Sequence, residues 1–516
     1  MTPTTMEVSP KSVGPLLNQW GLKADWENAE SSIFTGVSYD SRSVAPGHIF
    51  FCVVGEKMNG NDFIPQALAG GAVLIVSETP KPSGFSHPYL QVKDVRQAMS
   101  EAADYLYEHP SQKLRVLGVT GTNGKTSTTH IIEHILNGSG RKAGLVGTMG
   151  VRWAGAGHGD DYIEAKHTTP QAADLHRLFY QMVKGGVSHI AMEVSSHALA
   201  LKRVDNCQFA SACLTNITQD HLDFHKTMEH YWKSKLLLFS ALNHSPMDPK
   251  NAIVNRDLEL ANEFLSALDP DFNKFTYGFS DGADFQAKNA HFDHSGTKLT
   301  VLTPDGPLDL KLQLVGNFNV YNVLAALAIC FTEGVSKDEL KEGLESFPGV
   351  SGRFQSVSSS APTKEPLCIV DYAHSPDGLE NVLRVARELV PASGKLITVF
   401  GCGGDRDSSK RPQMGAIAEN LADTVVVTSD NPRSEDPQQI IVDILAGIKR
   451  MNEDILVEPD RAKAIQLAVL DAADNDVVLI AGKGHETYQI IKDQVFDFDD
   501  RVEVLKALKK RSETKS

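Results

Sequence analysis

The stretch Gly118-Val119-Thr120-Gly121-Thr122-Asn123-Gly124-Lys125-Thr126-Ser127 decides the fold of the central part of this chain. An apolar run from Leu114 to Val119 leads into it, and a predicted helix from Thr126 to Leu136 follows it. A strand, a glycine-rich turn and a helix in this order form a phosphate loop, whose backbone N–H groups and helix N-terminus converge on an anion. In such a loop Lys125 reaches the β- and γ-phosphates, and the hydroxyl of Thr126 binds Mg²⁺.

One position of this loop departs from the usual motif. The residue six before the lysine is Val119, and the glycines stand instead at Gly118 and Gly121. A tight glycine turn that binds no ligand is the alternative interpretation. The sequence Gly124-Lys125-Thr126 at a strand-to-helix turn favours nucleotide binding, although the loop alone names no reaction.

The length and net charge of the chain indicate how many domains it contains and which partners it can bind. A chain of 516 residues is too long for one hydrophobic core, and about three domains are expected. The formal net charge of −15 argues against a nucleic-acid partner, because a nucleic-acid site needs a concentrated basic face. The one basic cluster, within residues 506–515, is expected to be a solvated helix end and tail.

We expect neither a membrane segment nor a secretion signal. No run approaches 18 apolar residues, and the polar N-terminal stretch lacks a basic segment followed by an apolar one. The six cysteines form no Cys-x-x-Cys pair, and in a chain of this length they indicate reduced thiols. These features predict a cytoplasmic protein with no membrane partner.

The pattern of apolar runs predicts three domains, all of the α/β class. Residues 1–110 form a smaller N-terminal α/β domain, 111–350 the central domain with the phosphate loop, and 351–516 the C-terminal domain. Strands alternate with helices in the second and third, which is typical of a parallel sheet covered on both faces. We therefore predict a central sheet like that of P-loop ATPases and a Rossmann-like C-terminal domain. The predicted strands are 49–54, 72–76, 114–119, 143–146, 188–192, 212–216, 252–255, 367–370, 396–400, 424–428, 455–457 and 477–480.

Glu193 is the first candidate metal ligand outside the loop. It closes an apolar run, and a carboxylate at a strand end near a phosphate loop often binds Mg²⁺, directly or through water. A charged residue that merely ends a strand is the alternative. Ser195-Ser196-His197 follows at once, but adjacent residues rarely present a nucleophile and its base to each other, so we reject a hydrolase.

His221 and Lys235 are candidates of a weaker kind. His221 lies in a polar stretch that follows the predicted strand 212–216, where a metal ligand would fit. A structural role is commoner for a lone histidine. Lys235 lies in a predicted helix, where a solvated or snorkelling lysine is the default.

Short motifs are spread over essentially the whole chain. They are Gly121 to Thr126, His167 to Pro170, Glu193 to His197, Asp220 to Asp223, Gly316 to Asn322, Gly352-Arg353, Asp371 to His374, Asp430 to Arg433 and Gly482 to Glu486. With these motifs in this order, the chain resembles the Mur ligases, the family that adds amino acids to the peptidoglycan precursor peptide. Asp430-Asn431-Pro432-Arg433 is similar to the signature of the member that adds meso-diaminopimelate, and Gly482 to Glu486 supports the same member.

The resemblance implies an ATP-dependent amide ligase that adds meso-diaminopimelate to the D-glutamate of UDP-N-acetylmuramoyl-L-alanyl-D-glutamate. ATP activates a carboxylate as an acyl phosphate, the amine of the amino acid attacks it, and phosphate leaves. The protein positions three ligands and neutralises oxyanion charge, a task for Mg²⁺, Lys125 and a histidine. By resemblance, Thr126 and Glu193 hold one Mg²⁺, and His221 and a carbamoylated Lys235 serve a second.

The resemblance also assigns the binding residues. Arg433 grips the distal carboxylate of diaminopimelate bidentately, and L-lysine, which lacks that carboxylate, would leave it unpaired. The whole diaminopimelate set is Arg406, Asp430, Asn431, Pro432, Arg433, Gly482 and Glu486. The nucleotide-sugar peptide is assigned to Ser41, Thr168, Thr169, Ser195 and Arg203, and Leu201 departs from the polar residue expected there. ATP is assigned to the loop residues Gly121, Thr122, Asn123, Gly124, Lys125, Thr126 and Ser127 and to Asn255, Asn319, Asn322, Arg353 and Asp371.

Three alternatives to this function stay open at this point. The same chemistry with L-lysine is the nearest, and Arg433 argues against it. A folate polyglutamate ligase shares the fold and mechanism, but those enzymes begin close to the phosphate loop, whereas this chain has a long N-terminal domain. A nucleotide-dependent switch is the third; the chain has no Asn-Lys-x-Asp guanine motif, and a switch would not need the loop at Asp430 to Arg433.

Overall fold

The computed structural model describes residues 8–55, 58–154, 163, 167–218, 222–243, 245–293, 296–359, 365–450 and 453–515. The chain divides into two compact units, and each is described by itself. The first comprises Met1–Lys288, Val301–Leu308 and Tyr321–Leu344, and the second comprises Asn289–Thr300, Asp309–Val320 and Glu345–Ser516. Both contain helices and parallel strands, so the predicted α/β class is confirmed. Among the described residues, no helix is long and apolar enough to cross a membrane.

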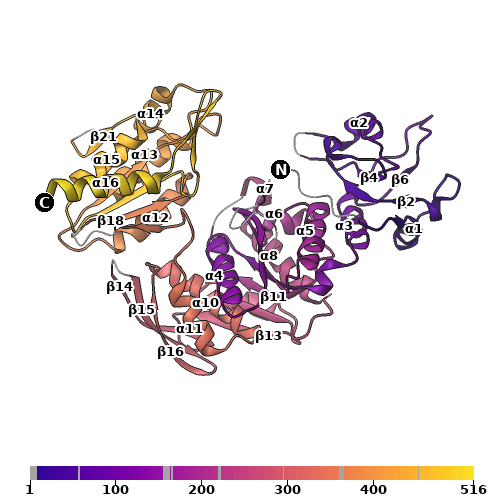
Figure 1. Ribbon diagram of the computed structural model, residues 1–516, viewed down its shortest axis with the longest axis horizontal. Coiled ribbons are helices and arrows are strands. Elements are labelled where there is room, and N and C mark those ends of the chain that lie inside the picture. The colour runs from indigo at the N-terminus through magenta and orange to yellow at the C-terminus, as the bar shows by residue number, and fades with distance from the viewer. Residues whose placement is uncertain are drawn as a thin grey trace. The chain divides into compact units, whose positions relative to one another are not determined.

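The first unit begins with a small parallel sheet of order β3-β4-β5-β6 (Figure 1). Its elements are β1 Lys11–Ser12, α1 Gly14–Trp20, β2 Ile33–Phe34, β3 Gly36–Ser38, β4 His48–Phe51, α2 Ile64–Ala69, β5 Leu74–Ser77, β6 Tyr89–Gln91 and α3 Val95–Leu106, with 3₁₀ turns at Ala29–Ser31, Ser41–Ser43, Gly60–Phe63 and Pro110–Lys113. Successive side chains of β4 point to opposite faces, so Phe51 joins the core beneath α3 and Phe50 joins a smaller core beside α2. Asp94 caps α3 by accepting from the N–H groups of Arg96 and Gln97.

A ten-stranded sheet of order β16-β15-β14-β13-β12-β11-β7-β10-β8-β9 surrounds the phosphate loop. Its strands are β7 Arg115–Thr120, β8 Ala143–Gly147, β9 Gly150–Trp153, β10 His189–Glu193, β11 Phe209–Leu214, β12 Asn251–Asn255, β13 Asn273–Gly278, β14 Phe285–Asp293, β15 Gly296–Thr303 and β16 Gly306–Leu312. Strands β10 and β11 flank β7 in parallel register, so their carboxyl ends lie beside the loop that follows β7. This is the position where ligands bind in open parallel sheets.

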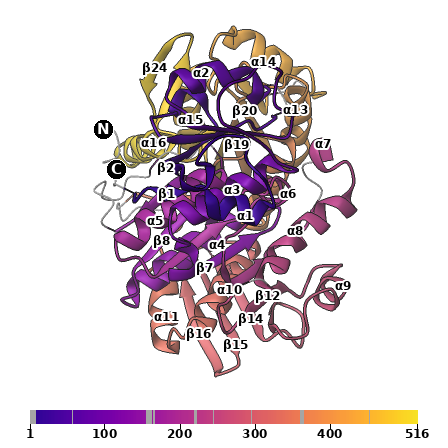
Figure 2. The same ribbon diagram turned by 90° about the vertical axis from the view of Figure 1, so that its right-hand side faces the viewer.

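Helices pack around this sheet and against one another. They are α4 Lys125–Gly138, α5 Ala172–Lys184, α6 Ser196–Ala200, α7 Leu222–His225, α8 Met228–Asn243, α9 Ala261–Ser266, α10 Asn317–Thr332 and α11 Lys337–Ser346. Helix α4 packs against β8 and β10, and α8 packs against β7 and β11. Figure 2 shows α4 next to β7 and β8. The contact of α8 with β7 depends on Gly118, where a Cβ atom would lie 2.9 Å from Phe209 and 3.0 Å from Leu238. Helix α3 packs against α5, so the small N-terminal sheet shares its core with this region.

The second unit holds a six-stranded sheet of order β17-β18-β22-β19-β20-β21. Its elements are β17 Gln355–Val357, β18 Leu367–Asp371, α12 Pro376–Glu388, β19 Leu396–Phe400, α13 Lys410–Leu421, β20 Thr424–Val427, α14 Pro437–Leu445, β21 Ile455–Val457, α15 Arg461–Asp471, β22 Val477–Ala481, β23 Tyr488–Ile491, β24 Gln494–Asp497 and α16 Asp500–Lys515. Ile369 of β18 packs with α12, α13 and α14, whereas its neighbours Cys368 and Val370 pack with α15 and α16. The sheet is therefore covered on both faces, as the alternation of strands and helices predicted.

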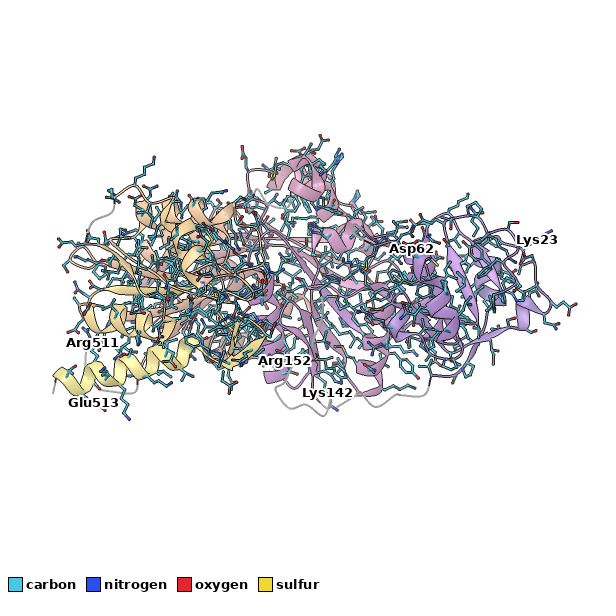
Figure 3. All side chains as sticks on the ribbon, turned by 90° about the horizontal axis from the view of Figure 1, so that it is seen from above. Lys23, Asp62, Lys142, Arg152, Arg511 and Glu513 are labelled. Atoms are coloured by element: carbon cyan, nitrogen blue, oxygen red, sulfur yellow. The ribbon has the colours of Figure 1, made fainter. Side chains whose placement is uncertain are left out.

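The basic C-terminal segment forms the last turns of α16, where Figure 3 labels Arg511 and Glu513. Lys506, Lys509 and Lys510 are exposed, as expected of a solvated helix end. Arg511 differs, because its side chain is buried and donates hydrogen bonds of 3.2 and 3.0 Å to the carbonyl groups of Val469 and Leu470. These carbonyls belong to the last turn of α15, so Arg511 satisfies acceptors that the helix itself leaves open.

Candidate active site

The phosphate loop is held against the carboxyl end of β11. The hydroxyl of Thr215 donates a hydrogen bond of 2.6 Å to the carbonyl of Asn123, and the N–H of Asn123 donates one of 2.8 Å to Oδ1 of Asn216. A Cβ atom at Gly121 would lie 1.8 Å from the Thr215 hydroxyl oxygen, so only glycine allows this approach. Gly124 has a left-handed backbone with φ of 85°, which begins α4. The loop therefore has a defined conformation that its neighbours impose.

Lys125 and the start of α4 line the inside of this loop. The Lys125 ammonium donates hydrogen bonds of 2.8 Å each to the carbonyl oxygens of Gly121 and Thr122. Ser127 lies in the first turn of α4, half-buried. A Cβ atom at Gly124 would lie 2.3 Å from Oδ1 of Asn322, so this predicted ATP ligand borders the loop. The ammonium and the helix N-terminus place positive charge where an anion would bind.

Glu193 is the acceptor for three neutral donors at the end of β10. Its carboxylate accepts hydrogen bonds from the hydroxyl of Thr126 at 3.0 Å and from the N–H and hydroxyl of Thr148 at 2.9 and 3.0 Å. Its side chain is fully buried, and a Cβ atom at Gly147 would lie 2.2 Å from its Oε1. A buried carboxylate next to a threonine hydroxyl is a hard oxygen donor set of the kind that Mg²⁺ prefers. The structure thus brings Thr126 and Glu193 together, and they fit the predicted metal.

His221 and Lys235 are the other two predicted metal residues. His221 lies outside the described residues. Lys235 is 1% exposed, and its Nζ lies 4.3 Å from the centre of the Tyr231 ring, whose hydroxyl is 3.0 Å from the Thr122 hydroxyl. The default of a solvated lysine is therefore wrong, because the side chain is buried on the face of α8 that meets the phosphate loop. In the described part of the chain, no group of three or more His, Cys, Asp or Glu side chains could hold a metal ion.

A cavity of about 1310 Å³ lies in the first unit. It is lined by four of the five residues predicted for the nucleotide-sugar peptide, namely Ser41, Thr168, Ser195 and Arg203, and also by Leu201. Thr168 links the cavity to the metal residues, because its hydroxyl oxygen lies 3.1 Å from that of Thr148. The fifth residue, Thr169, is fully buried; its hydroxyl donates to the carbonyl of Glu193 at 2.9 Å and accepts from the N–H of Ser195 at 3.1 Å. Thr169 therefore orders the end of β10 without lining the cavity.

The remaining predicted ATP residues are divided between the units. Asn255 lies in the first unit and donates a hydrogen bond of 2.9 Å to the carbonyl of Thr215, beside the loop. Asn319, Arg353 and Asp371 lie in the second unit. Asn319 donates to the carbonyl of Val315 at 3.0 Å, and Asp371 accepts from the N–H groups of Phe354 and Ala373 at 2.7 and 2.8 Å. Burial raises the pKa of the Asp371 carboxyl, and the charge of Arg353 and these hydrogen bonds oppose the rise.

Most of the predicted diaminopimelate residues meet at the carboxyl end of the second sheet. The amide of Asn431 donates a hydrogen bond of 2.9 Å to Glu486 and accepts one of 3.0 Å from the buried Lys483. A Cβ atom at Gly482 would lie 2.6 Å from Oδ2 of Asp430, so the two segments are in close contact. Pro432 is buried next to Asn431. The Lys483 ammonium also forms an ion pair of 3.2 Å with Glu486, so the network already holds one cationic group.

Arg433 follows the network in an unusual backbone conformation. Its φ of 51° lies in the left-handed region, and its backbone exchanges hydrogen bonds of 3.1 and 2.7 Å with Ile490 and Lys492. Its guanidinium donates a hydrogen bond of 2.8 Å to the carbonyl of Gly404. Arg406 is exposed in the same loop, and a Cβ atom at Gly403 would lie 3.0 Å from the Arg433 guanidinium and 3.8 Å from Arg406. Strain of this kind persists where surrounding structure demands it, which is common at binding sites.

Family models match three segments of the chain. The segment 33–107 matches the "Mur ligase family, catalytic domain", 119–330 the "Mur ligase middle domain", and 352–484 the "Mur ligase, glutamate ligase domain". A UDP-N-acetylmuramoyl-L-alanyl-D-glutamate–2,6-diaminopimelate ligase of Geobacillus thermodenitrificans is 45% identical over 474 residues, which cover 92% of this chain and 94% of the relative. The chain belongs to the Mur ligase family. The prediction of the family, and with it that of a ligase, is confirmed.

Solved structures of Mur ligases share the fold. The structure of a UDP-N-acetylmuramoyl-L-alanyl-D-glutamate–2,6-diaminopimelate ligase matches with a TM-score of 0.70 and 32% identity, over 97% of this chain and all of that one. A MurF ligase from Thermotoga maritima in complex with ADP matches with a TM-score of 0.59 and 20% identity, over 93% and 98% of the two chains. The second match supports the fold alone.

Several residues of this Mur ligase site were not predicted from its sequence. Thr148 bonds Glu193, Tyr231 contacts both Thr122 and Lys235, and Lys483 is buried beside Asn431. Thr148 follows a predicted strand, so the rule that ligands bind at strand ends would have found it. Lys483 follows the predicted strand 477–480 and lies in the motif Gly482 to Glu486, so the same rule would have found it. Tyr231 carries no such signal, because only the packed structure brings it to the site.

Proposed function

We propose that this Mur ligase uses ATP and Mg²⁺ to join meso-diaminopimelate to the D-glutamate of UDP-N-acetylmuramoyl-L-alanyl-D-glutamate. The substrate named for the relative from Geobacillus and for the structural neighbour at 32% identity supports this choice. The observation in this structure that carries it is the network of Asp430, Asn431 and Glu486, which Arg433 follows in the chain with its guanidinium bonded to the Gly404 carbonyl. Diaminopimelate has a distal ammonium and a distal carboxylate, which are the groups that such a network and such an arginine bind.

The reaction proceeds through an acyl phosphate. A carboxylate oxygen of the D-glutamate residue attacks the γ-phosphorus of ATP, the bond to the β,γ-bridging oxygen breaks, and ADP leaves. The amine of diaminopimelate then attacks the acyl carbon and loses a proton, and the tetrahedral intermediate collapses as phosphate departs. The chain supplies no nucleophile, so its contribution is to position the reactants and to stabilise charge.

The phosphate loop and Lys125 hold the phosphates of ATP. Lys125 donates to two loop carbonyls in this structure, so its ammonium already lies in the concave side of the loop where the phosphates would enter. The N–H groups at the start of α4 and its dipole add to this positive field. The rim of the phosphate loop is formed by Thr122, Asn123 and Ser127. Next to this rim lie Asn255 and Asn322.

Thr126 and Glu193 would hold a magnesium ion, with His221 and a carbamoylated Lys235 near a second. Bound Mg²⁺ supplies charge neutralisation on the transferred phosphoryl group. Lys235 is buried against Tyr231, and the proposed carbamate would convert this buried cation into an anion that a metal can bind. His225 supports the same region by bonding Ser196 at 2.9 Å.

The three domains predicted from the sequence divide this work. We assign the nucleotide sugar to residues 1–110 and part of the central domain, ATP mainly to 111–350, and diaminopimelate to 351–516. The cavity lined by Ser41 and Arg203 supports the first assignment. We place the reaction in the cytoplasm because ATP is available there, and the six buried, unpaired cysteines agree with a reducing compartment.

Mass spectrometry of the product tests this function. The purified chain is incubated with ATP, Mg²⁺, UDP-N-acetylmuramoyl-L-alanyl-D-glutamate and an equimolar mixture of meso-diaminopimelate and L-lysine. The expected product carries one diaminopimelyl residue. A lysyl product would retain the ligase and overturn the role of Arg433, and an unchanged nucleotide sugar would contradict the proposal.

A further inference from the structure

Two arginines on the wall of the 1310 Å³ cavity have guanidinium groups that are only partly used. Arg96 lies in the first turn of α3 and donates a hydrogen bond of 3.0 Å to the carbonyl of Val54. Arg203 follows α6 and donates one of 3.2 Å to the carbonyl of Thr169. Within the ranges that the structure describes, Nη1 of Arg96 and Nε of Arg203 are buried and lack a hydrogen-bond partner. Buried donors of this kind normally have partners, so a ligand is the natural acceptor.

The acids nearest to Arg96 are engaged elsewhere. Asp94 caps α3 and forms an ion pair of 2.8 Å with Lys202. Glu78 accepts a hydrogen bond of 3.0 Å from the N–H of Val95. Neither carboxylate forms an ion pair or a hydrogen bond with the Arg96 guanidinium, so Arg96 and Arg203 lack a carboxylate partner among the described residues.

Arg42, a third arginine that lines the cavity, does have a carboxylate partner. It donates two hydrogen bonds of 2.9 and 2.6 Å to Asp40, which offsets its charge. Arg96 and Arg203 instead repel each other, because burial and the charge of Arg96 both lower the pKa of Arg203. Burial likewise lowers the pKa of Arg96, and Asp94 and Glu78 oppose this. A bound dianion would relieve the repulsion.

The direction of the substrate in the cavity follows from where the chemistry occurs. The reacting carboxylate must reach the phosphate loop, and Thr168 lies 3.1 Å from Thr148, which itself bonds Glu193. This wall of the cavity is therefore the reacting end. Arg203 bonds the adjacent Thr169, whereas Arg96 bonds Val54 in the N-terminal region. Arg96 thus faces the part of the substrate that is remote from the reacting carboxylate.

We propose that Arg96 binds the diphosphate of the nucleotide-sugar substrate through its free guanidinium edge, with Arg203 adding positive charge in the same cavity. The proposal rests on the proposed function and adds a residue to it. An arginine fork matches two phosphate oxygens, and a diphosphate carries the charge needed to offset two guanidinium groups. The contact is made equally in the ground and transition states, so it fixes affinity and position and leaves the chemical step unaltered.

Calorimetric titration of the full chain with UDP and with uridine tests this role. Arg96→Gln should weaken UDP binding by about tenfold or more, since a hydrogen bond to a charged group is lost. Uridine, which has no phosphate, should bind equally to both proteins, and this equality also reports that the variant is folded. Arg96→Lys should recover part of the UDP affinity, because a point charge remains. Lys93→Gln is the matched control: Lys93 is exposed, lies three residues before Arg96 and is not among the cavity residues.

Steady-state kinetics supply a second readout. Arg96→Gln should raise KM for the nucleotide-sugar substrate by about the same factor as it weakens UDP binding, with kcat little changed. Wild-type UDP affinity in Arg96→Gln would overturn the proposal. Loss of affinity for the complete dipeptide substrate alone would also overturn it, because Arg96 would then bind a carboxylate. A wild-type chain that binds UDP but ligates no diaminopimelate would instead contradict the proposed function and leave the role of Arg96 standing.

Discussion

The hydroxyl of Thr126 donates a hydrogen bond of 3.0 Å to the carboxylate of Glu193. The two residues are 67 positions apart, and they meet because β7 and β10 are parallel neighbours whose carboxyl ends coincide. The bond joins the first turn of α4 to the end of β10 in a site with no solvent exposure at Glu193. In the proposed function, these two oxygen donors would hold a magnesium ion.

Glu193→Gln tests that role. The amide keeps nearly the same shape but removes the negative charge, so kcat should fall by about 100-fold or more, as expected when several kcal/mol of metal-assisted stabilisation is lost. The measurement is kcat as a function of Mg²⁺ concentration. Glu333→Gln is the control, because Glu333 is another buried carboxylate but binds Arg115 and His189 at the opposite ends of β7 and β10. That variant should lose stability and keep kcat. A Glu193→Gln enzyme with normal kcat would remove this residue from the metal site.

Lys235→Ala should abolish most of the activity. If Lys235 carries a carbamate at the metal, added short-chain carboxylic acids should restore part of the rate by supplying the missing carboxylate. The control is Lys233→Ala on the same helix, since Lys233 is exposed and pairs with Glu229 at 2.6 Å. Initial rates with and without formate or acetate are the measurement. Full activity of the unrescued Lys235→Ala protein would contradict the assignment.

Arg433→Ala should reduce the selection of diaminopimelate over L-lysine. Loss of a charged contact to the distal carboxylate should raise KM for diaminopimelate by about 10-fold to 100-fold, with ATP affinity unchanged. Arg384→Ala provides the comparison, because Arg384 is exposed on α12 and pairs only with Glu380 of the same helix among the residues described. The ratio of kcat/KM for the two amino acids decides the matter. An unchanged ratio would mean that selection lies elsewhere.

The stability of the second unit should depend on pH through His485. Burial, with Arg353 and Arg501 nearby, lowers the pKa of His485 to about 4, below the usual value of 6.5. The unfolded chain therefore binds a proton more readily between about pH 4 and 6.5, so the contribution of the neutral imidazole is present above pH 6.5 and is lost as the pH falls toward 4. Thermal unfolding of the wild type and His485→Gln should show a difference in Tm that shrinks across this window. A difference that is constant with pH would contradict this account.

The twelve predicted strands coincide with observed strands to within a few residues, because buried parallel strands are continuous apolar runs bounded by polar loops. The strands β3, β6, β9, β13 and β17 were not predicted. The run 396–400 coincides with β19, and 143–146 lies within β8. The strands β14 to β16 were not predicted, although Leu308, Leu310 and Leu312 of β16 alternate with exposed residues. Such alternation is the signal of a strand with one exposed face, and it contains no continuous apolar run.

Candidate site residues were predictable where a residue type suited to the chemistry stands at the end of a predicted strand or in the phosphate loop. Thr126 and Glu193 combine a characteristic residue type with a strand or loop end, so pattern alone located them. Arg96 was not predictable, since its functional feature is a guanidinium edge left free by the hydrogen bonds of its neighbours. The left-handed backbone of Arg433 was equally hidden, because arginine has no intrinsic preference for that conformation.

Phosphate release from ATP tests the central claim most directly. The full chain is given ATP, Mg²⁺ and UDP-N-acetylmuramoyl-L-alanyl-D-glutamate, with meso-diaminopimelate, L-lysine or no amino acid. Rapid, stoichiometric release that requires diaminopimelate is the predicted result, and it would establish both the ligase reaction and its amino-acid substrate. Equal release in all three reactions, or release that requires L-lysine, would contradict it.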